Sequence, residues 1–172
     1  MKRKRKIARN WLELPAEVMS TIMLKLGAIE ILTSAQFVCS SWNKICKDPS
    51  MWRVIDMHNL GDLHDMEYNL EIMCMHAVFR TRGQLDDINI EYFGTDDLLR
   101  YITRSTNQLR RLRIAVCYDI SDKGLTKAVL KLPLLEHLEI FLCSFSAKTL
   151  KMVGQCCPLL KTLKLNNQFC KG

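Results

Sequence analysis

One hydrophobic pattern recurs four times in the second half of the chain. Each copy places aliphatic residues at its first, fourth and sixth positions, and the copies begin at Leu85, Leu109, Leu135 and Leu160. These starts are 24, 26 and 25 residues apart. A nearly fixed period of this length indicates stacked repeats, because one such unit cannot bury its apolar face alone. Residues 85–172 are therefore expected to form a parallel sheet in which return segments join successive strands.

The pattern matches the signature of leucine-rich repeats, and the segments between copies support that interpretation. They carry apolar residues at helical spacing, and Pro133 and Pro158 each stand two residues before the next copy, where proline ends a helix. Cys117 and Cys143 occupy the Asn or Cys position of the signature and are expected to pack in the core. Because no return helix follows the fourth strand, we expect three units and an incomplete fourth. Its exposed edge would reflect either a truncated chain or a partner that covers it.

Strand alternation predicts which side chains face the concave surface. Residues between and beside the inward aliphatic positions form three columns across neighbouring strands. The columns are Asp87, Arg111, His137, Thr162; Asn89, Arg113, Glu139, Lys164; and Glu91, Ala115, Phe141, Asn166. The candidate target-binding residues are Arg111, Arg113, His137, Glu139, Phe141 and Lys164. Arg113, Glu139 and Lys164 could equally pair with one another as a surface charge ladder, whereas an exposed Phe141 would be a recognition anchor.

Residues 11–53 have a different organisation, that of three short amphipathic helices. The first begins near Pro15 and ends near Gly27, the second follows Glu30, and the third ends before the pair Asp48–Pro49. About forty residues seldom bury enough apolar surface to fold alone. This segment therefore needs cover, either from the rest of the chain or from a partner, and periodicity does not decide between them.

The order and spacing of residues in this segment resemble an F-box. The resemblance rests on the runs Leu14-Pro15-x-Glu17-Val18, Glu30-Ile31-Leu32, Val38-Cys39-Ser40-Ser41-Trp42 and Asp48-Pro49-Ser50-Met51-Trp52-Arg53, with Ile22 and Leu26 between them. It implies binding to the Skp-family adaptor of an SCF ubiquitin ligase and, through that adaptor, to a cullin and a RING subunit. The implied adaptor-binding residues are Leu14, Pro15, Val18, Met19, Ile22, Leu26, Ile31, Leu32, Val38 and Trp42.

Taken together, the two patterns resemble plant F-box/leucine-rich-repeat proteins. The expected fold is mixed α+β, with a three-helix F-box followed by a short α/β solenoid built on a parallel sheet. We expect a basic tail over 1–10, the F-box over 11–53, a linker and joining helix over 54–84, and the repeats over 85–172. The resemblance implies a non-catalytic receptor that brings an unknown target protein to the ligase. The alternative is an adaptor-binding protein that recruits no target.

The net charge of +7 belongs largely to the N-terminal tail. Lys2, Arg3, Lys4, Arg5, Lys6 and Arg9 are six of the 25 cations, which leaves 19 cations against 18 anions in the rest of the chain. The balance provides no case for a nucleic-acid surface on the body. The tail itself could be a nuclear import signal, a solvated end or a polyanion contact. No export signal or membrane span is recognisable, so we expect the nucleus, the cytoplasm or both.

The cysteines and histidines do not form a pattern that indicates chemistry. The eight cysteines include no C-x-x-C pair, and the neighbours of His58, His64 and His76 do not complete a zinc-ligand spacing. No local signature of a catalytic cysteine is present either. We therefore expect reduced thiols, no metal or other cofactor, and no enzymatic activity.

Overall fold

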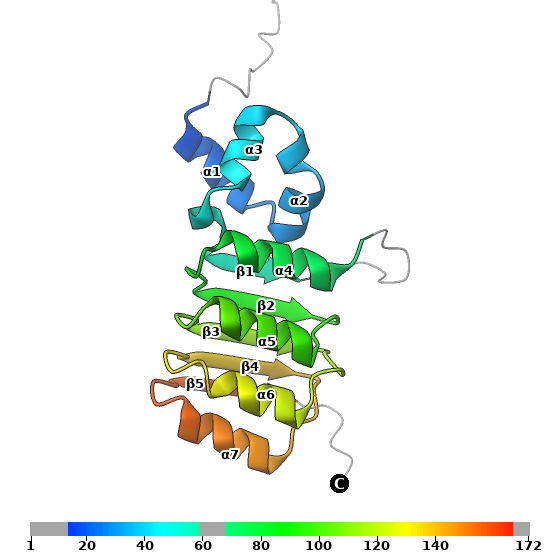
Figure 1. The fold of residues 1–172 in the computed structure, drawn as a ribbon, viewed down its shortest axis with the longest axis vertical. Helices are drawn as coiled ribbons and strands as arrows, with labels where there is room; N and C mark the ends of the chain where they lie inside the picture. Colours follow the sequence, from blue (N-terminus) through cyan, green and yellow to red (C-terminus); the bar gives the residue numbers. More distant parts are fainter. Residues whose placement is uncertain (1–13, 59–67, 167–172) are drawn as a thin grey trace, which may run out of the picture.

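The computed structural model describes residues 14–58 and 68–166. The basic tail, Trp11, His64, Gln168 and Cys170 lie outside these ranges. The described chain consists of a helical module followed by a solenoid of strands and helices (Figure 1). This arrangement confirms the mixed α+β fold expected from the sequence.

The helical module is built from short elements joined by tight turns. Its elements are α1 (Ala16–Leu24), α2 (Ala28–Thr33), η2 (Ala35–Phe37), α3 (Ser40–Cys46) and η3 (Pro49–Trp52). Gly27 has a φ of +84°, a left-handed conformation that glycine adopts without strain, and it separates α1 from α2. No single described helix is long and apolar enough to cross a bilayer, although α1 and the segment Ala28–Phe37 together meet that test across a bend of 118°.

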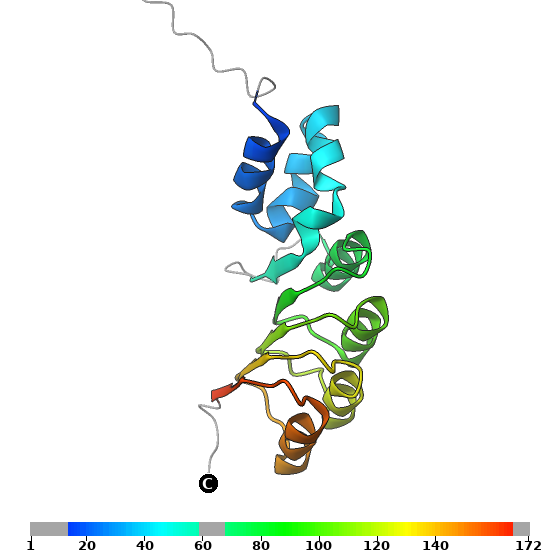
Figure 2. The same ribbon diagram turned by 90° about the vertical axis from the view of Figure 1, so that its left-hand side faces the viewer.

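The solenoid places every strand in one parallel sheet and its helices on one side of that sheet. The sheet has the strand order β1-β2-β3-β4-β5, and Figures 1 and 2 show α4 to α7 stacked against the same face. The strands are β1 (Val54–Met57), β2 (Asp87–Glu91), β3 (Arg111–Ala115), β4 (His137–Phe141) and β5 (Thr162–Asn166). The helices are α4 (Leu70–Arg80), α5 (Asp96–Ser105), α6 (Asp122–Val129) and α7 (Ala147–Cys156).

The register of the sheet is the one that the repeat spacing predicts. Asp87 pairs with Arg111, Arg111 with His137, and His137 with Thr162, and the other two columns align in the same way. The aliphatic positions of β2, β3 and β4 are buried under the helices, whereas Leu163 and Leu165 of β5 are 38% and 44% exposed. Among the described residues, β5 therefore pairs on one side only, and its two inward leucines are largely exposed.

The structure adds a strand that the pattern did not anticipate. Strand β1 pairs in parallel with β2, with Ile55 opposite Ile88 and Met57 opposite Ile90. The same offset sets Trp52 level with Leu85, so a tryptophan stands where the later repeats have leucine. The segment 54–84, expected to be a linker and a joining helix, thus supplies a complete strand-and-helix unit. The joining helix, expected over Met66–Arg82, is α4.

One core runs through the module and the solenoid. The buried residues from Met19 of α1 to Cys157 after α7 form a single apolar cluster. Trp52 is 1% exposed, and its indole Nε1 donates to the carbonyl of Cys46 at 2.8 Å. Arg80 of α4 lies over the Trp52 ring, 5.2 Å from its centroid, and donates to Gln36 Oε1 at 2.8 Å. The first repeat is therefore also the covering layer of the helical module.

Hydrogen bonds join the amino ends of neighbouring return helices. Ser121, the N-cap of α6, donates through its backbone N and its Oγ to Asp96 of α5 at 2.8 and 2.6 Å. The same arrangement recurs one repeat later, where Ser146 donates to Asp122 at 2.9 and 3.0 Å. Each cap hydroxyl also accepts a bond from the first turn of its own helix. The caps therefore fix both the start of each helix and its position against the preceding repeat.

Two helical glycines are expected to respond to alanine in opposite directions. A Cβ at Gly124 of α6 would lie 1.7 Å from Asp96 Oδ1, so Gly124→Ala must displace the carboxylate that binds Ser121. Loss of these two exposed hydrogen bonds is expected to destabilise the fold by about 1 kcal/mol. A Cβ at Gly154 of α7 would meet nothing within 4 Å, so Gly154→Ala should stabilise the fold by about 0.5–1 kcal/mol. Urea unfolding measures both changes, and shifts in the same direction would contradict this account of the caps.

Candidate functional site

The helical module exposes an unusual share of the large apolar side chains. Of the sixteen that are exposed among the described residues, six lie between residues 14 and 38. Four were expected from the sequence, namely Leu14 at 37%, Val18 at 44%, Leu26 at 43% and Val38 at 60%. Leu24 and Phe37 join them, at 53% and 72%. Six large exposed apolar side chains within 25 residues of sequence indicate an interaction surface in this module.

The remaining residues of the expected adaptor face divide by burial. Pro15 is exposed, and Ile22 and Trp42 are half-buried. Met19, Ile31 and Leu32 are only 3%, 2% and 8% exposed. These three side chains pack inside the module and therefore act by holding its helices together.

Sequence patterns alone did not single out Leu24 or Phe37. Leu24 ends α1, and Phe37 ends the short η2 helix immediately before Val38. The signal available in the sequence was the adjacent apolar pair Phe37-Val38 just before the serines that open α3. Two large apolar residues at a helix boundary cannot both face the core of a module this small.

A cavity of about 390 Å³ opens between α1 and α3 in the same module. Leu14, Met19 and Trp42 line it, together with the polar side chains of Ser20 and Ser41. The indole Nε1 of Trp42 is buried and has no hydrogen-bond partner among the described residues. A buried donor without an acceptor is costly, by about 1–3 kcal/mol, so this position favours a partner that supplies an acceptor.

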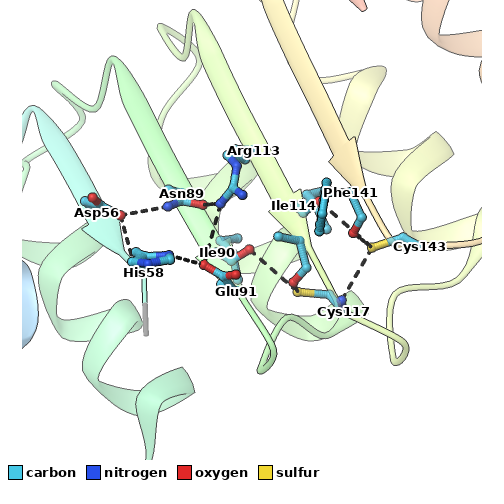
Figure 3. Close-up of polar contacts among 11 residues, drawn as sticks. Asp56, His58, Asn89, Ile90, Glu91, Arg113, Ile114, Cys117, Phe141 and Cys143 are labelled. Atoms are coloured by element: carbon cyan, nitrogen blue, oxygen red, sulfur yellow. Dashed lines mark hydrogen bonds and ion pairs between the residues drawn. The ribbon is translucent and has the colours of Figure 1, made fainter. Parts of the chain in front are cut away.

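The concave face of the sheet carries a second, polar surface, which Figure 3 shows in part. Asp56 of β1 accepts hydrogen bonds from Asn89 Nδ2 at 2.7 Å and from the backbone N of His58 at 2.9 Å. Arg113 donates through Nη1 to Asn89 Oδ1 at 2.8 Å and lies 3.6 Å from the Glu91 carboxylate. Side chains from three neighbouring strands are thereby held in one network.

This network decides in part between the two interpretations of the central column. Lys164 Nζ does bind Glu139 at 2.8 Å, as a charge ladder requires, and that contact lowers the pKa of the Glu139 carboxyl. Arg113 instead turns toward Glu91, which is only 6% exposed and also contacts His58. The network includes Asp56 and His58, which sequence reasoning missed because it did not anticipate β1.

The other expected target-binding residues also lie on the sheet. Arg111 is exposed and its Nε lies 3.3 Å from Asp87, whose pKa is raised because the carboxyl is partly buried. His137 and Phe141 are half-buried at the two ends of β4. The His137 side chain makes no ion pair or hydrogen bond within the described ranges. The structure thus brings all six candidates onto one face, with most of the charges already paired internally.

Cys117 and Cys143 belong to the core, as expected. Cys117 and Cys143 are 1% and 2% exposed, and the Cys117 Sγ donates to the carbonyl of Ala115 at 3.1 Å (Figure 3). Burial raises the pKa of the Cys117 thiol to about 12 and that of Cys74 likewise to about 12. Such thiols are poor nucleophiles at neutral pH. No cluster of three or more His, Cys, Asp or Glu side chains converges on a metal position within residues 14–58 and 68–166.

Comparisons with known proteins match the helical module and the repeats separately. The F-box-like family profile matches residues 11–58, and a profile described as FBD-associated F-box protein At5g56370, LRR repeats, matches residues 84–171. The second match alone covers half of the chain.

Similar proteins occur in Arabidopsis thaliana. The chain is 62% identical to F-box protein SKIP19 over 91% of its own length and 52% of that relative, and 52% identical to F-box/LRR-repeat protein 23 over 95% of its length and 36% of that relative. It is 48% identical to F-box/LRR-repeat protein 9, covering 66% of it. The chain therefore spans about half or less of the first two relatives. On its two matched regions and these likenesses, the chain belongs to the plant F-box/leucine-rich-repeat proteins.

Proposed function

We propose that the helical module docks this chain onto a Skp-family adaptor of an SCF ubiquitin ligase. The observation that carries the proposal is the group of six exposed apolar side chains between residues 14 and 38. The module's own core is filled by other residues, including Met19, Ile31 and Leu32, so cover for the exposed group is left to a partner. Membership of the F-box family supports an adaptor as that partner.

On this proposal the repeats hold a target protein while other subunits transfer ubiquitin. The concave face offers a paired polar network along its centre, with His137 and Phe141 on β4 beside it. Interfaces of this kind depend on a few anchors surrounded by polar contacts. The chain then acts without catalytic residues of its own, by holding the target near the ligase. Its cullin and RING contacts are made through the adaptor.

A paired substitution at the start of α1 tests the docking surface. Leu14→Ala with Pro15→Ala is expected to abolish co-purification of the adaptor and cullin, because both residues are exposed and their loss leaves the repeats intact. The matched control is Pro158→Ala with Leu159→Ala, an exposed Pro-Leu pair on the solenoid. Pull-down from plant extract with circular dichroism of each protein is the measurement. Unchanged adaptor binding in the first variant would rule out this docking surface.

The second candidate function is an adaptor-binding protein that recruits no target. It is favoured by the internal pairing of the concave charges and by the uncovered last strand, which leave a small free surface. Target abundance distinguishes the two functions. A receptor lowers the level of at least one protein that binds the repeats, whereas the alternative predicts no such change when the chain is removed.

A further inference from the structure

The convex side of the solenoid carries a concentration of positive charge that the overall composition hides. Beyond residue 10 the chain has nearly equal numbers of cations and anions. The three return helices α5, α6 and α7 lie on one side of the sheet (Figures 1 and 2), and together with the turn after α6 they carry seven exposed cations. They are Arg100, Arg104, Lys123, Lys127, Lys131, Lys148 and Lys151.

These cations differ from those on the strand side in how they are neutralised. The six cations in or beside the strands of the sheet, Arg53, Arg110, Arg111, Arg113, Lys161 and Lys164, all form ion pairs. On the helices only Arg100 does so, at 2.6 Å from Asp97. The other six have no carboxylate within 4 Å among the described residues. Asp96 and Asp122 lie nearby but accept hydrogen bonds from Ser121 and Ser146.

Five of these seven cations, four of them unpaired among the described residues, flank a groove between α5 and α6. The groove has a volume of about 480 Å³ and is lined by Arg100 and Arg104 on one helix and by Lys123, Lys127 and Lys131 on and just after the other. Asp96 and Asp97 also line its end at the start of α5, where Asp97 pairs with Arg100 and Asp96 accepts from Ser121, so cations outnumber carboxylates five to two. Ala128 and Leu130 also line it, and Leu130 is 60% exposed. The groove therefore combines two basic rows with an apolar surface.

The spacing of the two rows fits an extended peptide. Residues four apart on a helix lie about 6 Å apart along its axis, and alternate side chains of an extended chain repeat at about 6.6–6.8 Å. Carboxylates at every second position of a peptide would meet Lys123 and Lys127 of α6, and Lys131 follows in the turn after the helix. The apolar lining provides a place for an aliphatic side chain. A peptide can supply such a side chain, whereas a nucleic-acid backbone cannot. We propose that this groove binds an acidic peptide segment that carries an apolar residue.

Charge reversal along α6 tests the proposal in the full chain. The probe is a short fluorescent peptide in which Asp and Glu alternate with Ser around a central Leu, and fluorescence anisotropy reports binding. The variant Lys123→Glu, Lys127→Glu, Lys131→Glu is expected to weaken binding by about tenfold or more. The control Lys25→Glu, Lys44→Glu, Lys47→Glu makes the same charge change at exposed residues of the helical module and should alter binding by less than about twofold.

The same measurements identify the results that would overturn the proposal. Both variants keep the basic tail. An equal loss of peptide affinity in the two variants would mean that the peptide responds to the net charge of the chain or binds the tail, and not the groove. A peptide with Asn and Gln in place of its acids is expected not to bind, and Leu130→Asn should weaken the acidic peptide severalfold. Absence of binding, or tighter binding of duplex DNA or anionic vesicles to the same lysines, would make the proposal wrong. If the triple Glu variant unfolds, the triple Gln variant provides the comparison.

Discussion

A Val38→Asp protein is expected to keep its fold and to lose adaptor binding by about a hundredfold or more. Val38 follows η2 and is 60% exposed, so the chain loses little packing when it is replaced. In the proposed complex the new carboxylate would be enclosed by apolar groups without a partner, which costs several kcal/mol. A loss of about 2.7 kcal/mol already corresponds to a hundredfold in the dissociation constant. Surface plasmon resonance with purified adaptor measures it.

The chain offers a closely matched control for this substitution. Val54 begins β1 and is 59% exposed, so Val54→Asp introduces the same charge at the same exposure on the solenoid. That protein is expected to bind the adaptor as the unmodified chain does. If Val38→Asp binds normally, or if both variants lose binding equally, the docking face does not include the turn before α3.

Trp52→Ala is expected to lower the free energy of unfolding by about 3–5 kcal/mol. Trp52 is almost completely buried, its indole donates to Cys46, and the Arg80 guanidinium lies over its ring. Removal of the ring leaves a cavity between the helical module and the first repeat, and the Cys46 carbonyl keeps only its hydrogen bond from Arg80 Nη1, at 3.2 Å. Because the core is continuous at this point, we expect one destabilised transition rather than the loss of a single part.

Urea unfolding followed by circular dichroism and by fluorescence tests this expectation. Tyr118→Ala is the control, since Tyr118 is 74% exposed and its replacement should change stability by less than about 0.5 kcal/mol. A change of less than about 1 kcal/mol for Trp52→Ala would contradict the role of Trp52 as the joint. Two separate unfolding transitions in the unmodified chain would contradict the continuity of the core.

Repeat periodicity was sufficient to predict the register of β2 to β5. Side chains of a strand alternate, and a fixed period places equivalent residues side by side, so the sequence alone aligns Arg113, Glu139 and Lys164. Strand β1 was not predicted, for two reasons. Trp52 stands where the repeat pattern has leucine, and Trp52 lies 33 residues before Leu85, a longer interval than those between the later repeats. A strict pattern does not recognise an aromatic substitute at a boundary between two motifs.

The candidate sites were predicted less completely than the fold, and the physical reason differs for each surface. A family pattern identifies apolar positions but not their burial, so it grouped Met19 with Val18 although only Val18 is exposed. Rotamer choice decided the charge pairing, since Arg113 reaches back to Glu91 rather than forward to Glu139. The basic convex face could not be predicted from composition, because a balanced total charge says nothing about which side of a sheet each charge occupies.

The segment shared by the two motifs, η3 with β1, determines how a bound target would be presented. Trp52 closes the helical module and occupies the first position of the first repeat, so the described chain has no hinge between the docking face and the concave sheet. A target on that sheet would therefore be held at a fixed distance and angle from the adaptor. Any search for an acceptor lysine must then come from motion of the target or of the other ligase subunits. Changes at Arg80 would accordingly alter which lysine is reached before they alter how tightly the target is held.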